Sequence, residues 1–315
     1  SPAQNYTYNN TAGSSYPIIA MNGKYVMGRS YTKAQGDRYD GGNSSLYGYN
    51  FAEQFEYALS KNPDVLFVTG WNEWVADRQV TWPADAGYNQ TANALPDTFK
   101  DEYSRDIEPT KGALKDNSYD QMVNYIRRYK GTEAITPAGK AMAIDITGDR
   151  SSYGYGGRLY TETSGRNDII GAQVARDDDN LYFLVECMDN ITSYTGGRWM
   201  TLYLDTDQSN QGWETFDYVI NKTTPTATTA TLERFTGNGY ETETVGTVSY
   251  AVDGRYLQIK IPKKLVGISG YDFTVNFSVT DNVHDEGNYD TFSGDIMDFY
   301  ISGDVMPGGR FKYSF

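Results

Sequence analysis

The sequence predicts a chain of two parts, an α/β segment followed by an all-β domain, and three observations lead to this fold class. Helix-like and strand-like patterns alternate in residues 1–132, whereas residues 133–315 contain almost only short strand patterns and turns. A connector rich in Gly, Pro and Thr, Gly131–Lys140, lies at the boundary. The charge also changes there: residues 1–132 contain 13 Lys and Arg against 15 Asp and Glu, and the remaining 14 basic and 26 acidic residues leave a net charge of −12 on residues 133–315.

The elements of residues 1–132 follow the order expected of a partial (β/α) barrel. A short strand is expected within Met21–Ser30, and apolar spacing predicts amphipathic helices over Phe51–Ser60, with Asn50 as its N-cap, and over Ser118–Lys130. Between the helices, Asp64–Gly70 (DVLFVTG) is a continuous apolar run bounded by turn residues. Such a run is typical of a parallel strand buried on both faces.

Residues 133–315 are expected to form an antiparallel β-sandwich, because short alternating strands are separated by turn signals such as Asp253-Gly254. The expected strands are Ile170–Ala175, Asn180–Cys187, Trp199–Leu204, Asp217–Asn221, Ala230–Phe235, Thr244–Ala251, Tyr256–Ile261, Asp272–Thr280 and Met297–Ser302.

Composition excludes several classes of function. One Cys (Cys187) and one His (His284) rule out a disulfide within the chain and disfavour Cys/His zinc sites and Ser-His-Asp catalysis. A net charge of −14 disfavours a nucleic-acid partner. No apolar run approaches the ~18–20 residues of a membrane-spanning helix, so no membrane span is expected. The 28 Tyr suit surfaces that stack on sugars, although tyrosine is also common in ordinary exposed strands.

The sharpest local feature is the motif Trp71-Asn72-Glu73-Trp74, which follows the expected strand directly. At the carboxyl end of a barrel strand, such side chains reach the active site. Apolar indole walls raise the pKa of a carboxyl group and stack on sugars, so Glu73 is the candidate catalytic residue and Trp71, Asn72 and Trp74 are candidate substrate-binding residues. In the alternative interpretation, the rings cap a strand and Glu73 pairs with a nearby arginine.

Two further residues are candidates for the same cleft. Arg29 ends the expected strand in Met21–Ser30, and Trp82 lies on the long loop after Glu73. A structural arginine and a loop anchored by a buried ring are the alternatives. Glycosidases use two carboxylates, and the local candidates for the second are Asp77, Asp106 and Glu108, which as readily act as solvated loop acids or in ion pairs.

Phe67–Val75 (FVTGWNEWV), continued by Phe99–Pro109 (FKDEYSRDIEP), resembles the last strand of glycoside-hydrolase-like (β/α)8 proteins, where a Trp-Asn-Glu-Trp sequence follows that strand. The resemblance implies hydrolysis of a glycosidic bond in a polysaccharide or oligosaccharide, without a cofactor for catalysis, by a bacterial protein. A complete barrel takes ~250 residues. The chain is therefore expected to be the C-terminal part of a larger enzyme, inactive alone, with the missing N-terminal part of the barrel as its partner.

Residues 141–315 resemble family nine carbohydrate-binding modules and DOMON-like sandwiches. The resemblance rests on Ala175–Glu186 (ARDDDNLYFLVE), Asp189-Asn190, Trp199–Asp207 (WMTLYLDTD), Gly212-Trp213 and Phe216-Asp217-Tyr218; the early Trp of that family is not evident. The implied function is sugar binding, for which Trp199, Trp213 and Tyr194 are candidate stacking residues. A place in the core is the alternative for each ring.

Asp205, Asp207 and Asp217 are the candidate metal ligands. Calcium takes 6–8 oxygen ligands, and a structural calcium ion suits an acidic extracellular sandwich, although a solvated acidic turn explains the same residues. Asp177–Asp179 form a second acidic turn, and Asp281, Asp285 and Glu286 form a third.

Together these patterns predict a secreted or cell-surface carbohydrate-active protein, with a glycoside hydrolase favoured and the enzyme assignment left open. The alternative is a noncatalytic glycan-binding or adhesion fragment, in which the sandwich carries the function. A surface structural protein without a sugar ligand is a third possibility, which burial of all five Trp would favour.

Overall fold

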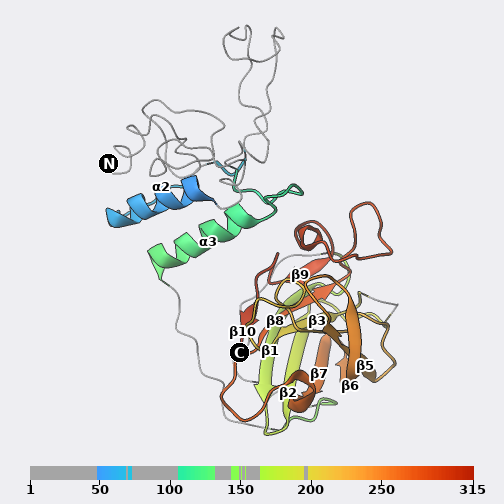
Figure 1. Ribbon diagram of the computed structural model, residues 1–315. Coiled ribbons are helices and arrows are strands. Elements are labelled where there is room, and N and C mark those ends of the chain that lie inside the picture. The colour runs from blue at the N-terminus through green and yellow to red at the C-terminus, as the bar shows by residue number, and fades with distance from the viewer. Residues whose placement is uncertain are drawn as a thin grey trace. The chain divides into compact units, whose positions relative to one another are not determined.

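The computed structural model describes residues 48–68, 70–72, 106–131, 143–148, 150, 153, 164–194 and 198–315. The chain divides into two compact units, residues 1–134 and residues 135–315, which we call the helical unit and the β-unit after the elements described in each. Figure 1 shows both units.

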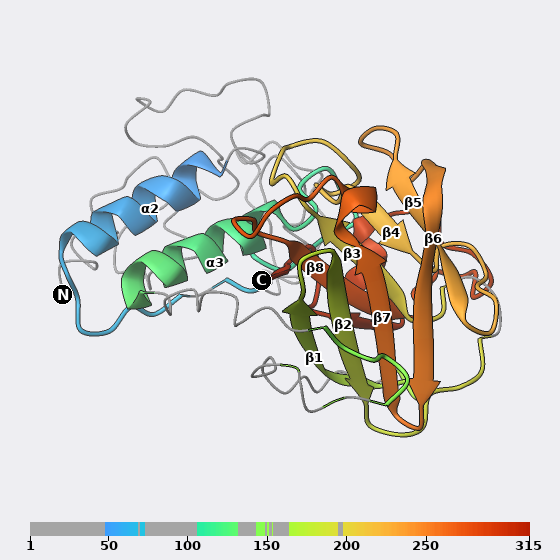
Figure 2. The same cartoon turned by 90° about the horizontal axis from the view of Figure 1, so that it is seen from below.

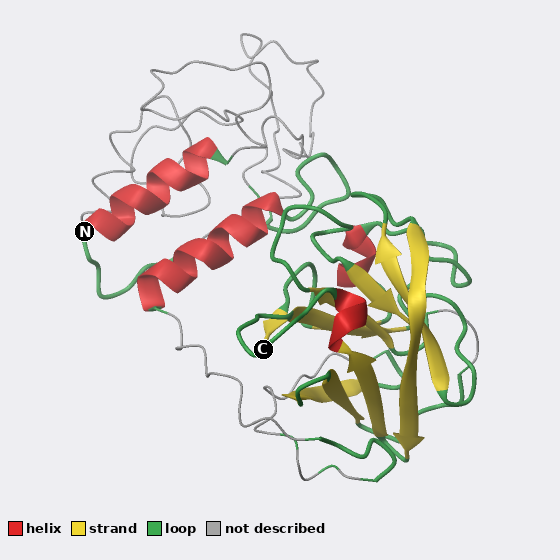
Figure 3. Ribbon diagram, turned by 60° about the horizontal axis from the view of Figure 1, so that its bottom comes forward, coloured by secondary structure: helices red, strands yellow, loops and turns green. Residues whose placement is uncertain are grey.

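Two α-helices, α2 (Tyr49–Ser60) and α3 (Asn117–Lys130), lie side by side in the helical unit (Figure 3). Their apolar faces meet, since the rings of Phe55 and Tyr125 stack with centroids 4.6 Å apart. Glu56 binds the Arg128 guanidinium on the same side, with Oε2 2.9 Å from Nη2. The amphipathic spacing of both helices is thus confirmed. Gly48, with φ of 62°, occupies the N-cap of α2, so the assignment of this position to Asn50 was wrong.

The expected partial (β/α) barrel is wrong. Asp64–Val68 forms no strand, and Val65 and Phe67 are 80% and 71% exposed instead of buried. A parallel strand needs a neighbouring strand to satisfy its backbone groups and helices on both faces to cover its side chains. The described residues of the helical unit contain two helices and no strand, so this apolar run has no sheet to join. The described structure is predominantly β.

The ten strands described in the β-unit belong to one antiparallel sheet with the order β1-β2-β7-β6-β5-β4-β3-β8-β10, in which β9 also pairs with β8. Figure 2 shows β1, β2, β7 and β6 side by side in that order. The strands are β1 (Ile169–Arg176), β2 (Asn180–Cys187), β3 (Thr201–Asp205), β4 (Tyr218–Ile220), β5 (Thr229–Phe235), β6 (Thr242–Asp253), β7 (Tyr256–Pro262), β8 (Asn276–Asp281), β9 (Asp304–Met306) and β10 (Tyr313–Ser314).

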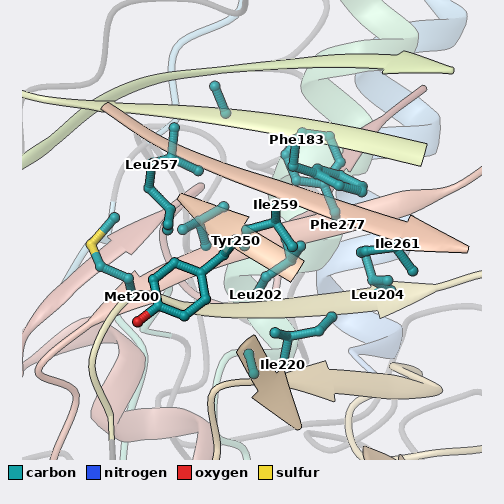
Figure 4. Close-up of a cluster of buried hydrophobic side chains, with 14 of the residues drawn as sticks. Phe183, Met200, Leu202, Leu204, Ile220, Tyr250, Leu257, Ile259, Ile261 and Phe277 are labelled. Atoms are coloured by element: carbon teal, nitrogen blue, oxygen red, sulfur yellow. The ribbon is translucent and has the colours of Figure 1, made fainter. Parts of the chain in front are cut away.

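The sheet curls into a nearly closed barrel, which corrects the expected sandwich of two separate sheets. The Asp304 carboxylate of β9 accepts a hydrogen bond from the backbone N–H of Ile169 in β1, and this bond links strands from the two ends of the sheet order. Phe183, Leu202, Ile259 and Phe277 belong to the main apolar cluster (Figure 4).

A second apolar cluster covers the face of the sheet opposite the main cluster at strand β3. Leu202 and Leu204 of β3 pack in the main cluster, whereas Tyr203 between them packs in a second cluster with Trp213 and Phe299. Successive side chains of a strand point to opposite faces, so β3 is buried on both. This explains why its five residues are all buried.

Most strand predictions are confirmed, and that of β2 has the bounds Asn180–Cys187 that the pattern indicated. The strand expected over Met297–Ser302 was wrong, because Ile296–Tyr300 forms a 3₁₀ helix, η3, capped by the Asp295 carboxylate at 3.0 Å from the Met297 N–H. β9 and β10 were missed, since three and two residues are too few to show an alternating pattern.

Candidate functional site

Trp71 and Asn72 are held against the segment that precedes α3. The Trp71 carbonyl accepts hydrogen bonds from the N–H groups of Ile107 (3.1 Å) and Glu108 (2.9 Å). Ile107 is buried in the core between the helices and so anchors this segment. These contacts bring residues 36 positions apart in the sequence into one cluster.

The resulting cluster combines an open aromatic ring with an amide and a carboxylate. Asn72 Nδ2 donates to Glu108 Oε2 at 2.8 Å. The Trp71 side chain is 48% exposed, and its ring meets the Tyr119 ring edge-on with centroids 5.9 Å apart. An indole face beside hydrogen-bonding groups is the kind of surface that holds a sugar. Glu108 was only one of three candidates for a second carboxylate, and the structure brings it to the motif.

Several residues predicted for this site lie outside the described part of the chain. They are Glu73, Trp74, Arg29 and Trp82, together with Asp77. The catalytic role of Glu73 therefore stays a prediction.

The three candidate metal ligands of the β-unit come together. Asp205 is the last residue of β3, Asp217 directly precedes β4, and Asp207 lies in the loop between them. One carboxylate oxygen from each residue lies within 4.8 Å of the others. The hairpin register sets this arrangement, because Leu204 pairs with Tyr218 and so aligns the two strand ends.

Other groups already contact these carboxylates. Asp205 Oδ2 accepts from Lys312 Nζ at 2.8 Å and from Asn276 Nδ2 at 3.1 Å, and Asp217 Oδ2 accepts from the Thr206 N–H at 2.6 Å. Lys312 lies more than 90 residues along the chain from the motif, and no sequence signal indicated it. It is the internal counterion of the cluster.

Burial and neighbouring carboxylates shift the pKa values of two groups in this cluster, Asp217 and Lys312. Burial raises the pKa of Asp217 above its ordinary value, and the carboxylates of Asp207 and Asp205 act in the same direction, whereas the Thr206 N–H opposes them. Burial also lowers the pKa of Lys312, although its hydrogen bond to Asp205 opposes this effect. Three carboxylates face one ammonium group, so negative charge remains in the cluster. Burying the charged forms of Asp217 and Lys312 costs folding free energy.

Both candidate stacking tryptophans of the β-unit lie in the core, which is the alternative interpretation of each. Trp199 is 1% exposed and its Nε1 donates to the Thr192 carbonyl at 3.0 Å. Trp213 is 2% exposed and its Nε1 donates to the Gly294 carbonyl at 2.8 Å. A buried indole offers no face for stacking, so in this structure neither ring can act as a platform. Tyr194 is 39% exposed.

The other two acidic turns are satisfied by local donors. Asp177 accepts from the Tyr182 hydroxyl at 2.6 Å, and Asp285 accepts from the Thr291 hydroxyl at 2.7 Å. Among the described residues, the group suited in spacing to a metal is Asp205, Asp207 and Asp217.

The chain has no match among protein-family models, curated proteins or solved structures. Within the described ranges, neither helix has the length and apolar character needed to cross a membrane.

Proposed function

We propose that this protein is a noncatalytic carbohydrate-binding protein and that Trp71, Asn72 and Glu108 contact the sugar. The observation that carries the proposal is the half-exposed indole next to the hydrogen-bonded amide and carboxylate. The indole stacks on the C–H face of a sugar ring, and the two polar groups exchange hydrogen bonds with its hydroxyls. A secreted or cell-surface location belongs to the same proposal.

Hydrolysis of the bound glycan is the second candidate function. Glycosidases use two carboxylates, and Glu108 binds the side chain of Asn72, the residue that precedes Glu73. The absence of the expected strand Asp64–Gly70 from the described structure removes the barrel argument for placing Glu73, and for this reason binding is the leading proposal. If the protein is a hydrolase, Glu73→Gln abolishes its activity; unchanged activity excludes Glu73 from the reaction.

Replacing Trp71 by alanine is expected to weaken glycan binding by about 5- to 140-fold, because stacking of a ring on an aromatic side chain contributes roughly 1–3 kcal/mol. Calorimetric titration with soluble oligosaccharides measures the effect. Phe67→Ala is the matched control, since Phe67 is an exposed aromatic residue of the same segment that no amide–carboxylate pair accompanies in the described structure. Equal losses in both variants would contradict the proposed site.

We propose in addition that the carboxylates of Asp205, Asp207 and Asp217 bind a structural calcium ion in competition with the ammonium group of Lys312. The oxygen spacing and the unbalanced negative charge support this proposal. The remaining ligands of a calcium ion would be backbone carbonyls and water.

Calcium is expected to raise the melting temperature of the β-unit above its value in EDTA. At a calcium concentration ~100-fold above Kd the gain is ~2.7 kcal/mol, or roughly 5–10 °C. Asp217→Asn tests the same site from the other side.

The raised pKa of Asp217 means that its ionised carboxylate destabilises the folded β-unit above that pKa, and this destabilisation decreases on acidification. The variant should therefore melt higher than wild type in EDTA and gain nothing from calcium. Equal melting of wild type in calcium and EDTA would exclude the ion.

A further inference from the structure

The ring of Tyr271 stands exposed on the β-unit in a fixed orientation. It belongs to the segment between η2 (Lys263–Val266) and β8, and 59% of it is exposed. Its hydroxyl donates to Asp178 Oδ1 in the turn between β1 and β2 at 2.6 Å. An exposed tyrosine ordinarily samples several rotamers, whereas this bond holds the ring against a second segment of the chain.

A buried lysine joins the two segments that carry Tyr271 and Asp178. Lys263 is 2% exposed, and its ammonium group donates to the carbonyls of Gly270 (2.6 Å) and Asp178 (3.1 Å). The Lys263 N–H also donates to the Asp179 carbonyl at 2.8 Å. These hydrogen bonds tie the loop that carries Tyr271 to the turn that carries Asp178. A ligand that binds the Tyr271 ring therefore need not order this loop.

Charged groups surround the ring and define what it can bind. The Arg176 guanidinium carbon lies 5.1 Å from the ring centroid of Tyr271 and 5.9 Å from that of Phe273. Arg176 Nε and Nη1 are buried without a hydrogen-bond partner in the described structure, so the rings are their neighbours. Asp178 and Asp179 are both exposed beside the ring. The Lys263 Nζ also lies 5.5 Å from the Tyr271 ring centroid. The surface therefore offers the exposed part of the ring, 59% of the residue, with carboxylate acceptors beside it.

We propose that Tyr271, with Asp178 and Asp179, forms a second glycan subsite that takes a neutral pyranose ring. The ring stacks on the C–H face of the sugar, and the carboxylates accept hydrogen bonds from its hydroxyls. The net charge of −12 on residues 133–315 disfavours an anionic sugar. A protein partner needs ~800 Å² on each side, far more than one ring amid charges supplies. The subsite rests on the proposed carbohydrate ligand, but it shares no residue with the Trp71 site.

The test is titration of the full chain with neutral oligosaccharides, followed both by calorimetry and by chemical-shift changes in the NMR spectrum. We expect Tyr271→Ala to weaken binding at least tenfold. Tyr271→Phe, which keeps the ring and removes the bond to Asp178, should show a smaller loss. Tyr289→Ala is the control, because Tyr289 is 74% exposed and packs on the His284 ring without a hydroxyl bond to an acid in the described structure.

The outcomes separate this inference from the proposed function. Loss of affinity in Tyr271→Ala with none in Tyr289→Ala supports the subsite, whatever Trp71→Ala does. Unchanged binding in Tyr271→Ala together with a loss in Trp71→Ala overturns the subsite and leaves the proposed function standing. Absence of binding by wild type to every neutral sugar tried overturns both.

Discussion

Replacing Asp281 by alanine is expected to destabilise the β-unit by about 3–5 kcal/mol, the cost of breaking a buried ion pair; here the carboxylate is fully buried and the Arg166 side chain is 28% exposed. Asp281 is fully buried at the end of β8. Its Oδ2 accepts from Arg166 Nε at 2.7 Å and its Oδ1 accepts from the Met200 N–H at 2.9 Å. The variant leaves the arginine charge and a backbone N–H without their acceptor, so the loss exceeds that of an ordinary hydrogen bond.

Urea unfolding followed by far-UV circular dichroism measures the change. The matched control is Asp253→Ala, which removes the exposed ion pair with Arg150, whose side chains are 62% and 38% exposed. Exposed pairs contribute about 0–1 kcal/mol. If the two variants lost the same stability, the buried network would have no special role. Hydrogen exchange on peptides from residues 164–315 assigns the transition to the β-unit.

Replacing Trp213 by alanine is expected to cost about 3–5 kcal/mol, the usual range for removing a large buried aromatic side chain. The ring centroid lies 4.8 Å from that of Tyr240 and 5.5 Å from that of Phe299. The cavity would open in the second cluster, which covers the outer face of β3. The Gly294 carbonyl would also lose its donor.

Trp213→Phe should lose less, because it keeps a ring in place and gives up only volume and the indole N–H. The same urea titration measures both variants, and circular dichroism avoids the loss of a fluorescent probe. Should Trp213→Ala unfold at the wild-type urea concentration, the ring would not be part of the core. That result would reopen its role as an exposed sugar platform.

Local patterns predicted the elements whose stability depends on their own side chains and immediate neighbours. The spacing of Met122, Val123 and Tyr125 placed α3 to within one residue at its start. The alternating run NLYFLVEC placed β2. The helix is longer than one turn and the strand is longer than three residues. Segments of this length show their apolar periodicity in the sequence itself, whatever they pack against.

Asp64–Gly70 shows where that reasoning ends. An apolar run is compatible with a buried strand, but the strand forms only if other segments supply neighbours for its backbone, and Val65 is 80% exposed in their absence from the described structure. Trp199 and Trp213 show the same limit in reverse. Their residue type suits either a sugar platform or a core. The fold buries Trp199 in the main cluster and Trp213 in the second cluster, on the outer face of β3.

The sequence by itself determined that the chain divides between a weakly charged first part and an acidic β-rich second part, and that Asp205, Asp207 and Asp217 lie near the ends of two strands. Only the tertiary structure decided that Glu108 meets Asn72, that Lys312 meets Asp205, and that Tyr271 is held by Asp178. The physical reason is that sequence patterns report local structure, whereas these contacts join residues far apart in the sequence. Periodicity reports which face of an element is apolar, whereas pairing between residues 36, 107 and 93 positions apart depends on how the chain returns upon itself.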